Sequence, residues 1–470
     1  MKQLSDTMKW FSPLRFVVDS LALSSSAGRL QLYGQKWITS ISEIKVIHDT
    51  TERLIDYFSV SDKKSVLEDI AYVLRDLRSI EATIGVLQNP DASVSDIDLF
   101  ELKNLALIES KVTKRVTEAN IDILPLPSLK EVLSILDIDH EELPGFYLSD
   151  KYSDELARLR KEQEAANSNE ELERISLLVA QEEDRVRRVL TEQLRPYSTP
   201  LSEALEALAS MDLFIAKAHW AIENTATKPI VIEKGLCSLQ GIVNPEVKFF
   251  LSRKNVDFQP VDISFGAFPT IITGANMAGK SVLLHTIGLV QMLLQYGFFV
   301  PAEHVELSLV EEVMLSMDDA SDQSKGLSSF GGEMIRLSKM AKKAKTGIPL
   351  LLLIDEAART TNPLEGRAIV EGLVAFFAKY STCAIITTHY SGIRGEANRL
   401  RIKGFIEENL KQPLKVANLN SYIDYSLVKE ESESTPREAL RIAEILGVDK
   451  ELLDNCRYCI EQDILIDGRE

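Results

Sequence analysis

The segment from residue 270 to residue 296 constrains the fold more than any other part of the sequence. A short β-branched run, TIIT, is followed by the glycine-bearing sequence GANMAGKS at residues 274–281 and then by an apolar stretch that opens a helix. Strand, glycine-bearing loop and helix in this order predict a phosphate-binding loop, because the glycines let backbone N–H groups point inward at a helix N-terminus. The segment therefore predicts an α/β fold that binds a nucleotide.

The side chains of this loop have predicted roles in holding ATP. We expect the ammonium group of Lys280 to reach the β- and γ-phosphates, and the hydroxyl group of Ser281 to hold Mg²⁺. The predicted nucleotide-binding residues of the loop are Gly274, Ala275, Asn276, Met277, Ala278, Gly279, Lys280 and Ser281.

Two later apolar runs end in polar residues that suit phosphoryl transfer. Leu350–Ile354 is followed at once by Asp355 and Glu356. Behind a phosphate-binding loop, such a strand end predicts that Asp355 faces Mg²⁺ and that Glu356 polarises the attacking water. His389 follows the run Cys383–Thr388 and is a candidate sensor of the γ-phosphate. The predicted catalytic residues are Glu356, Lys280 and His389, and the predicted metal ligands are Ser281 and Asp355.

The distribution of glycine, proline and apolar residues divides the chain near residue 230. Before this point glycine and proline are scattered and apolar residues recur at helical spacing. After it, short β-branched or leucine-rich runs alternate with helical stretches, a pattern typical of a largely parallel, buried sheet. We predict a helical region over 1–230, an α/β domain over 231–425 and a helical segment over 426–470.

Residues 150–195 mix acidic and basic residues, with nine Lys or Arg against twelve Asp or Glu. A polar break at Asn167–Asn169 divides the segment, which predicts an antiparallel helical hairpin. Its second arm would reach about 35–40 Å at 1.5 Å per residue. Alternating charges are also typical of a solvated helix pair that has no partner.

The composition excludes several classes of protein. The formal net charge of −18 argues against a generally basic surface that coats a polyanion, so any nucleic-acid contact must be local. Four cysteines in 470 residues cannot make a disulfide framework, and the isolated pair Cys456 and Cys459 lacks the second pair of a zinc site. The N-terminus has no apolar signal core and no run is long enough to span a membrane, which predicts a cytoplasmic protein without a membrane partner.

Four motifs stand in the order found in the ATPase domain of the MutS family, one of the ABC-type ATPases. They are GANMAGKS, SSFGGEM, LLLIDEAARTTNPLEG and TTHY. The chain resembles this family strongly from about residue 230 on and weakly before it. The sequence TIGLVQMLLQYGFFVPA is most similar to the bacterial branch associated with recombination rather than with mismatch repair. The resemblance implies an α/β ABC-type P-loop ATPase domain joined to an N-terminal all-α core and lever that carries the hairpin.

The resemblance also implies a homodimer with ATP at its interface. Ser328 and Ser329 of one subunit would complete the nucleotide site of the other, and residues 426–470 would contribute a dimer contact. By the same match, Asn276 is the loop asparagine of the family and His389 its switch histidine. Phe258, shortly before the first strand of the ATPase motif, is a candidate for stacking on adenine, although an aromatic residue there can equally belong to the core.

The sequence departs from the family pattern in two respects. The segment DEAARTT has Ala358 and Thr360 where family members usually carry glycines, so the dimer-facing loop and the rate of turnover are expected to differ. We expect neither mismatch reading nor nuclease activity from these 470 residues, because they contain no mismatch-reading motif before the helical region and no nuclease domain after the terminal helices.

Two functions remain open at this stage. In the first, the dimer is a nucleotide-gated clamp that closes on DNA, on repair or recombination structures rather than on mismatches. In the second, ATP cycling remodels a protein client, as in the MutS-like proteins that are taken to reactivate cobalamin-dependent lysine or ornithine aminomutases. The acidic charge and the modest hairpin favour the second function, and the family resemblance favours the first.

Overall fold

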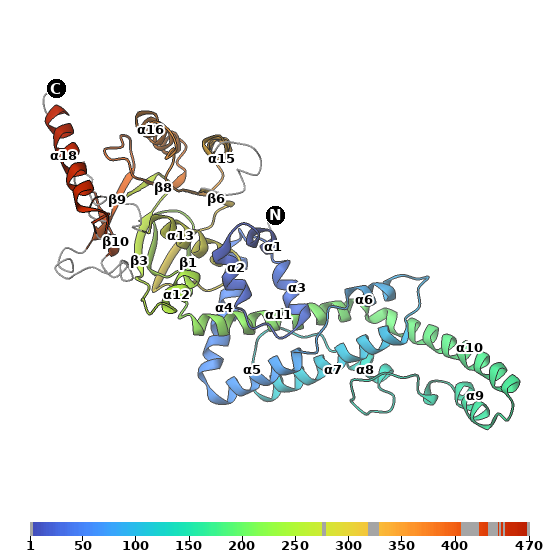
Figure 1. The fold of residues 1–470 in the computed structure, drawn as a ribbon. Helices are drawn as coiled ribbons and strands as arrows, with labels where there is room; N and C mark the ends of the chain where they lie inside the picture. The colour runs from blue at the N-terminus through green and yellow to red at the C-terminus, as the bar shows by residue number, and fades with distance from the viewer. Residues whose placement is uncertain are drawn as a thin grey trace. The chain divides into compact units, whose positions relative to one another are not determined.

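The computed structural model describes residues 3–274, 279–317, 329–405, 423–430, 440, 443–444 and 447–467. The chain divides into a helical unit and an α/β unit (Figure 1). The helical unit comprises Met1–Asp6, Leu21–Lys36 and Asp49–Ile222. The α/β unit comprises Thr7–Ser20, Trp37–His48 and Glu223–Glu470.

The helical unit is built from amphipathic helices around an apolar core. In α5, Leu67, Ile70 and Leu74 recur at helical spacing and are fully buried, in one cluster with leucines of α7 and α11. The helices that lie wholly or partly in this unit are α1 (Leu4–Met8), α3 (Ser26–Tyr33), α4 (Ile41–Ser59), α5 (Ser61–Leu74), α6 (Glu81–Gln88), α7 (Asp96–Glu118), α8 (Lys130–Leu136), η1 (Asp150–Tyr152), α9 (Asp154–Ala165), α10 (Asn169–Leu194), η2 (Arg195–Tyr197) and α11 (Ser198–Glu223).

Helices α9 and α10 form a hairpin and pack side by side (Figure 1). A serine hydroxyl caps each N-terminus: Ser153 accepts a hydrogen bond from the Leu156 N–H at 3.2 Å, and Ser168 accepts one from the Glu171 N–H at 3.2 Å. The turn between the two helices comprises residues 166–168, which overlaps the predicted break at Asn167–Asn169, although Asn169 is already the first residue of α10. α10 has 26 residues, in keeping with the expected length of the second arm.

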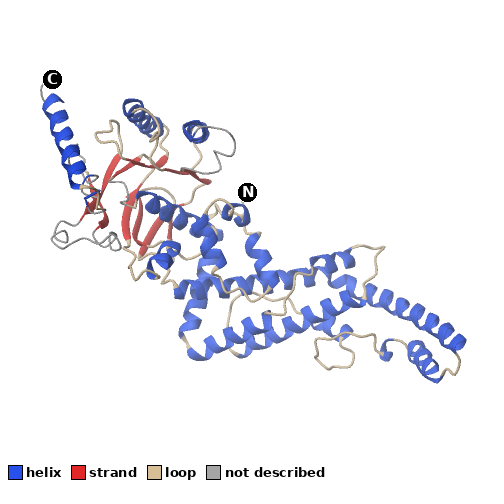
Figure 2. Ribbon diagram, in the orientation of Figure 1, coloured by secondary structure: helices blue, strands red, loops and turns tan. Residues whose placement is uncertain are grey.

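Among the described residues, the strands of the α/β unit form two sheets (Figure 2). The four-stranded sheet has the order β1-β5-β2-β3, and only β1 and β5 are parallel neighbours. The six-stranded sheet has the order β10-β9-β4-β8-β7-β6 and is parallel except for the pair β9–β10. The strands are β1 (Ile230–Ile232), β2 (Cys237–Ile242), β3 (Val261–Phe265), β4 (Thr270–Thr273), β5 (His304–Ser308), β6 (Glu312–Ser316), β7 (Leu350–Ile354), β8 (Cys383–Thr388), β9 (Asn398–Phe405) and β10 (Ile423–Lys429).

Helices cover both faces of the six-stranded sheet, which explains why its central strands are continuously apolar. All five residues of β7 are buried. Leu350, Leu352 and Ile354 belong to a core with α15 and α16, whereas Leu353 contacts Gly288 of α13. Figure 1 shows α13 on the opposite side of the sheet from α15 and α16. The helices of this unit are α2 (Ser12–Asp19), α12 (Pro245–Ser252), α13 (Lys280–Gln295), α15 (Ser329–Ala344), α16 (Pro363–Lys379) and α18 (Lys450–Asp467).

Two N-terminal segments cluster with the α/β unit, a division that differs from the predicted boundary at residue 230. The Thr7 hydroxyl lies 2.7 Å from the Tyr296 hydroxyl, and the Trp37 indole N–H donates to the Val310 carbonyl at 2.9 Å. Gln295 donates from its side chain to the Ile38 carbonyl at 2.8 Å. Residues 7–20 and 37–48 therefore pack against the end of α13 and the residues that follow it. These contacts join distant parts of the sequence, so local sequence patterns do not predict them.

The predicted boundary between residues 425 and 426 falls inside β10. This strand pairs with β9 from Ile423 to Lys429, so the sheet continues past the boundary. Among the described residues, no helix is long and apolar enough to cross a membrane.

Candidate functional site

The carboxyl ends of β4, β7 and β8 meet at one edge of the six-stranded sheet. Thr273 at the end of β4 pairs with Thr388 at the end of β8, and Ile354 at the end of β7 pairs with Ile386. Because these strands are parallel neighbours, the residues that follow them come together, although the ends of β4, β7 and β8 stand at positions 273, 354 and 388 of the sequence.

Lys280, the first residue of α13, is buried at this edge with 4% of its side chain exposed. Its ammonium group donates to the Gly274 carbonyl at 2.7 Å and lies 3.2 Å from a carboxylate oxygen of Glu356. Lys280 thus links Gly274, at the start of the glycine-bearing loop, to Glu356, the second acid after β7.

Gly279 caps the N-terminus of α13 in a left-handed conformation, with φ of +81°. A Cβ atom at this position would lie 3.0 Å from the ring of Tyr425 on β10. Backbone conformation and space both favour glycine here. Tyr425 is half-buried, and burial raises the pKa of its hydroxyl.

Ser281 and Asp355 face each other at the same edge. The Ser281 hydroxyl donates to the Asp355 carboxylate at 2.5 Å. The other carboxylate oxygen accepts from the Thr387 hydroxyl at 2.6 Å, and Thr387 in turn accepts from the Glu356 N–H at 3.0 Å. A hydroxyl and a carboxylate are oxygen donors that suit Mg²⁺, so this pair fits the predicted metal.

Glu356 has a left-handed backbone, with φ of +44°, and its side chain touches two cations. Burial alone would raise the pKa of Glu356, but the ammonium of Lys280 and the guanidinium of Arg359, 3.2 Å away, together lower it below its usual value. Glu356 is therefore a carboxylate at neutral pH and can accept a hydrogen bond from water.

The turn after Glu356 contains the first departure from the family pattern. Ala358 is fully buried with φ of +59°, a conformation that glycine adopts without strain. Its N–H donates to the Glu333 carboxylate at 2.7 Å, and its carbonyl accepts from the Tyr390 hydroxyl at 3.1 Å. These two hydrogen bonds hold the turn against α15 and against the residue after His389.

We expect Gly366→Ala to disturb this turn, because the new methyl group would overlap the Tyr390 hydroxyl and crowd the Ala358 carbonyl. The free energy of unfolding should fall by about 1–3 kcal/mol. Gly372, on the same helix, has open space at its Cβ position, so Gly372→Ala should raise it by about 0.5–1 kcal/mol. Urea denaturation of both variants checks the pair, and equal effects would contradict the packing argument.

Two histidines flank the site. His389 follows β8 with part of its side chain exposed. Partial burial of its ring lowers its pKa, as do the charges of Lys280 and Arg359, whereas the charge of Glu356 raises it. His285 lies one helical turn beyond Ser281 and packs edge-on against Phe11 at 5.5 Å, and burial lowers its pKa despite the charge of Asp355. Both rings are neutral at neutral pH.

Some predicted residues are not brought to this edge by the described part of the structure. Ala275, Asn276, Met277, Ala278 and Ser328 lie outside the described residues, and Ser329 is placed only as the first residue of α15. Phe258 is half-buried between α12 and β3. Its neighbour Gln259 bonds to β10, donating to Asp424 at 2.9 Å and accepting from the Tyr425 N–H at 3.0 Å.

Sequence reasoning missed two side chains at this edge. Thr387 stood inside a recognised motif but had no assigned role, although its hydroxyl joins Asp355 to Glu356. Tyr425 gave no signal, because it reaches Gly279 only through the pairing of β10 with β9.

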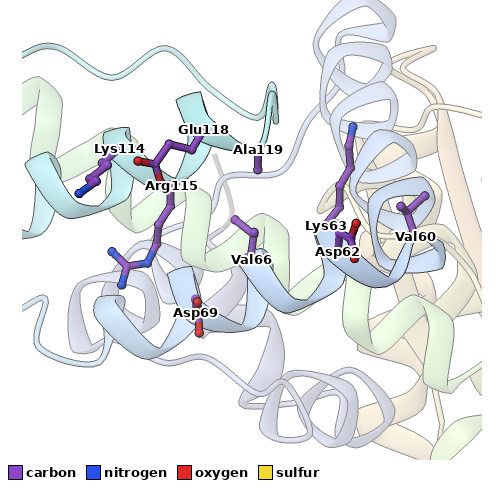
Figure 3. A pocket seen from close by; sticks show the side chains of 9 residues that line it. All are labelled: Val60, Asp62, Lys63, Val66, Asp69, Lys114, Arg115, Glu118 and Ala119. Carbon is purple, nitrogen blue, oxygen red and sulfur yellow. The ribbon is translucent and has the colours of Figure 1, made fainter.

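The helical unit has a pocket of its own, of about 760 Å³, between α5 and the end of α7 (Figure 3). Its lining mixes three cations with three carboxylates, which gives no single preference for an anion or a cation. The lining residues are Val60, Asp62, Lys63, Val66, Asp69, Lys114, Arg115, Glu118 and Ala119. No cluster of three or more metal-ligating side chains occurs among the residues that the structure describes.

The fold and the site together define an α/β protein in which a glycine-bearing loop, its lysine and the acids of a neighbouring strand converge. Residues 270–462 match the family model of MutS domain V. The endonuclease MutS2 of Caldanaerobacter subterraneus is 29% identical over 62% of this chain and 35% of its own length. The endonuclease MutS2 of Carboxydothermus hydrogenoformans is 24% identical over 99% of this chain and 60% of its own length. The DNA mismatch repair protein MutS of the same organism is 31% identical over 43% of this chain and 25% of its own length.

Residues 270–462, less than half of the chain, match domain V of the MutS family, and the MutS2 relatives support membership of this family. The chain spans less than two thirds of the length of these curated relatives.

Proposed function

We propose that this chain binds ATP with Mg²⁺ at the edge formed by β4, β7 and β8, and hydrolyses it. The observation that carries the proposal is that two pairs meet there: Lys280 lies 3.2 Å from Glu356, and Ser281 donates to Asp355 at 2.5 Å. Phosphoryl transfer depends chiefly on positioning and on stabilisation of charge, and this set supplies a cation, two oxygen donors and a carboxylate.

Each residue has a distinct role in the proposed reaction. Lys280 exchanges its contacts with Gly274 and Glu356 for the phosphates, which leaves the Glu356 carboxylate available to orient water and accept its proton. Ser281 and Asp355 hold Mg²⁺, which supplies charge neutralisation for the phosphates. Thr387 is a positioning residue that fixes the Asp355 carboxylate and the backbone of Glu356. His389, in its neutral form, senses the γ-phosphate.

The proposed working form is a homodimer. Ser328 and Ser329 of one subunit complete the nucleotide site of the other, and the segment 426–470 contributes to the dimer contact. Phe258 and Tyr425 are the two aromatic candidates for stacking on adenine, because the ring of Tyr425 lies against Gly279 and the segment of Phe258 is bonded to the same strand.

The proposed partner is DNA. Support comes from the relatives, which are described as endonucleases and as a DNA mismatch repair protein. In this proposal, ATP binding tightens the dimer and closes it as a clamp on DNA.

The steady-state ATPase rate of the purified chain, with and without duplex and four-way-junction DNA, tests this function. The Glu356→Gln variant, measured in parallel, reports contaminating activity. We expect stimulation by DNA that fades as salt rises, because phosphate contacts release counterions. An ATPase that responds to no DNA would overturn the DNA partner, and no ATPase above the variant would overturn the hydrolytic role.

Lys280→Ala should prevent the ATP-dependent tightening of the dimer. Loss of the ammonium group removes charged hydrogen bonds to the phosphates, each worth about 1.5–3 kcal/mol, so ATP affinity should fall at least tenfold. Sedimentation velocity with and without ATP checks the dimer, with the exposed Lys339→Ala on α15 as control. A wild-type profile that is identical with and without ATP would contradict the composite site.

A protein client is the second candidate, and the hairpin is the observation that favours it. Several of its arginines are engaged by acids of the same hairpin: Arg158 contacts Glu155 at 2.5 Å, and Arg160 contacts Glu183 at 2.9 Å. Leu177, 62% exposed on α10, adds apolar surface. Neutralised arginines offer little to phosphates, whereas exposed leucines suit a protein contact.

A further inference from the structure

Helix α12, which connects β2 to β3, presents aromatic and basic side chains to solvent. Phe249 and Phe250 are 40% and 52% exposed, and the neighbouring Lys248 is exposed as well. Residues 245–255, PEVKFFLSRKN, hold three basic residues and one acidic residue, in a chain whose net charge is −18. Two adjacent phenylalanines in water on a locally basic helix indicate a binding surface.

The aromatic part of this surface is held in place by α2. The Phe249 ring lies 5.4 Å from Phe16 and 5.6 Å from Phe250, between ring centroids. The Arg253 guanidinium lies over the Phe249 ring, 4.4 Å from the ring centroid. Phe249 is therefore fixed by its neighbours, and Phe250 offers the more open ring for stacking.

The basic part of this surface is available to a ligand. Within the described residues, Lys248, Arg253 and Lys254 form no ion pair with a carboxylate. The acid of the helix, Glu246, accepts a hydrogen bond from the Ser12 hydroxyl at 3.2 Å. The contrast with the hairpin is clear, because there Arg158, Arg160 and Arg187 are held by carboxylates.

We propose that the α12 surface, formed by Lys248, Phe249, Phe250, Arg253 and Lys254, binds single-stranded DNA, an inference that rests on the proposed action on DNA. Non-specific single-strand binding combines aromatic rings that stack on bases with cations that follow the backbone, and the α12 surface has both. A duplex keeps its bases stacked within the helix, so the exposed ring of Phe250 would gain less from it. The surface therefore selects unpaired strands, such as those at the branch of a repair or recombination structure.

Fluorescence anisotropy of the full chain with labelled oligo-dT of about 16 nucleotides, the upper end of usual site sizes, tests this surface. Phe250→Ala should weaken binding about 5- to 150-fold, because one stacked base is lost. Lys248→Gln should lower the slope of log affinity against log salt by about 0.7, the value for one phosphate contact on a single strand. Phe268→Ala, at a phenylalanine that is 41% exposed between β3 and β4, is the matched control and should bind as wild type.

The rate of ATP hydrolysis without DNA distinguishes a wrong α12 surface from a damaged protein. It should equal wild type in all three variants, which would show that the ATP site is intact. If Phe250→Ala and Lys248→Gln bind oligo-dT as wild type does, the α12 surface is not the contact. Duplex-stimulated hydrolysis without any oligo-dT binding overturns the α12 surface and leaves the DNA partner standing. If no DNA of either kind binds while hydrolysis persists, the DNA partner fails together with the α12 surface.

Discussion

Glu356→Gln should lower the rate of ATP hydrolysis by about 10² or more while ATP still binds. Glutamine keeps the size and the hydrogen-bonding capacity of glutamate but cannot take a proton from water. Lys280, Ser281 and Asp355, which we expect to hold the nucleotide and Mg²⁺, are unchanged in this variant. Single-turnover hydrolysis and equilibrium binding of a fluorescent ATP analogue measure the two effects separately.

Glu365→Gln is a matched control, because Glu365 is exposed in the first turn of α16. It should hydrolyse ATP as wild type does. Unchanged turnover in Glu356→Gln would remove Glu356 from its proposed role. In the nucleotide-free form, Lys280 and Arg359 hold the pKa of Glu356 below its usual value, against the effect of burial, so this group is a carboxylate before ATP binds.

Asp137→Ala should lower the free energy of unfolding of the helical unit by about 3–5 kcal/mol. Asp137, at the end of α8, lies 2.8 Å from the ammonium group of Lys103 on α7, and the two side chains are only 4% and 8% exposed. Removing the acid leaves a buried cation without its counter-charge, which costs far more than an exposed pair is worth. Denaturant unfolding followed by the helical circular dichroism signal measures the loss.

Asp122→Ala is the control for this pair, because Asp122 contacts Arg53 at 3.0 Å while the two side chains are 78% and 45% exposed. It should cost less than about 1 kcal/mol. A cost for Asp137→Ala no larger than that of Asp122→Ala would contradict the argument from burial. Burial tends to raise the pKa of Asp137, but hydrogen bonds from Lys103 and from the Glu142 N–H lower it. The stabilisation is therefore present above the ordinary aspartate pKa of about 3.9 and is lost as the pH falls through the lower folded value.

The interpretation of ATP as a ligand follows from residues that are close together in the sequence. A strand, a glycine-bearing loop and a helix form one continuous segment, and the two acids follow β7 directly. Local sequence patterns therefore predict both the phosphate-binding loop and the acids. The class of fold is predicted for the same reason, since short apolar strands that alternate with helices form a parallel sheet whose carboxyl ends share one edge. Leu350–Ile354 carried this signal because both of its faces are buried.

The sequence by itself determined which lysine, serine and acids are the candidate site residues, namely Lys280, Ser281, Asp355 and Glu356. It also determined the helical hairpin and its turn. Each of these features is encoded by neighbouring residues. Only the tertiary structure decided that Thr387 joins Asp355 to Glu356, that Tyr425 lies against Gly279, and that residues 7–20 and 37–48 belong to the α/β unit. The physical reason is distance along the chain. Thr7 meets Tyr296 across 289 positions, and β10 reaches the loop only through its register with β9, so the free energy of such contacts depends on packing that no local pattern records.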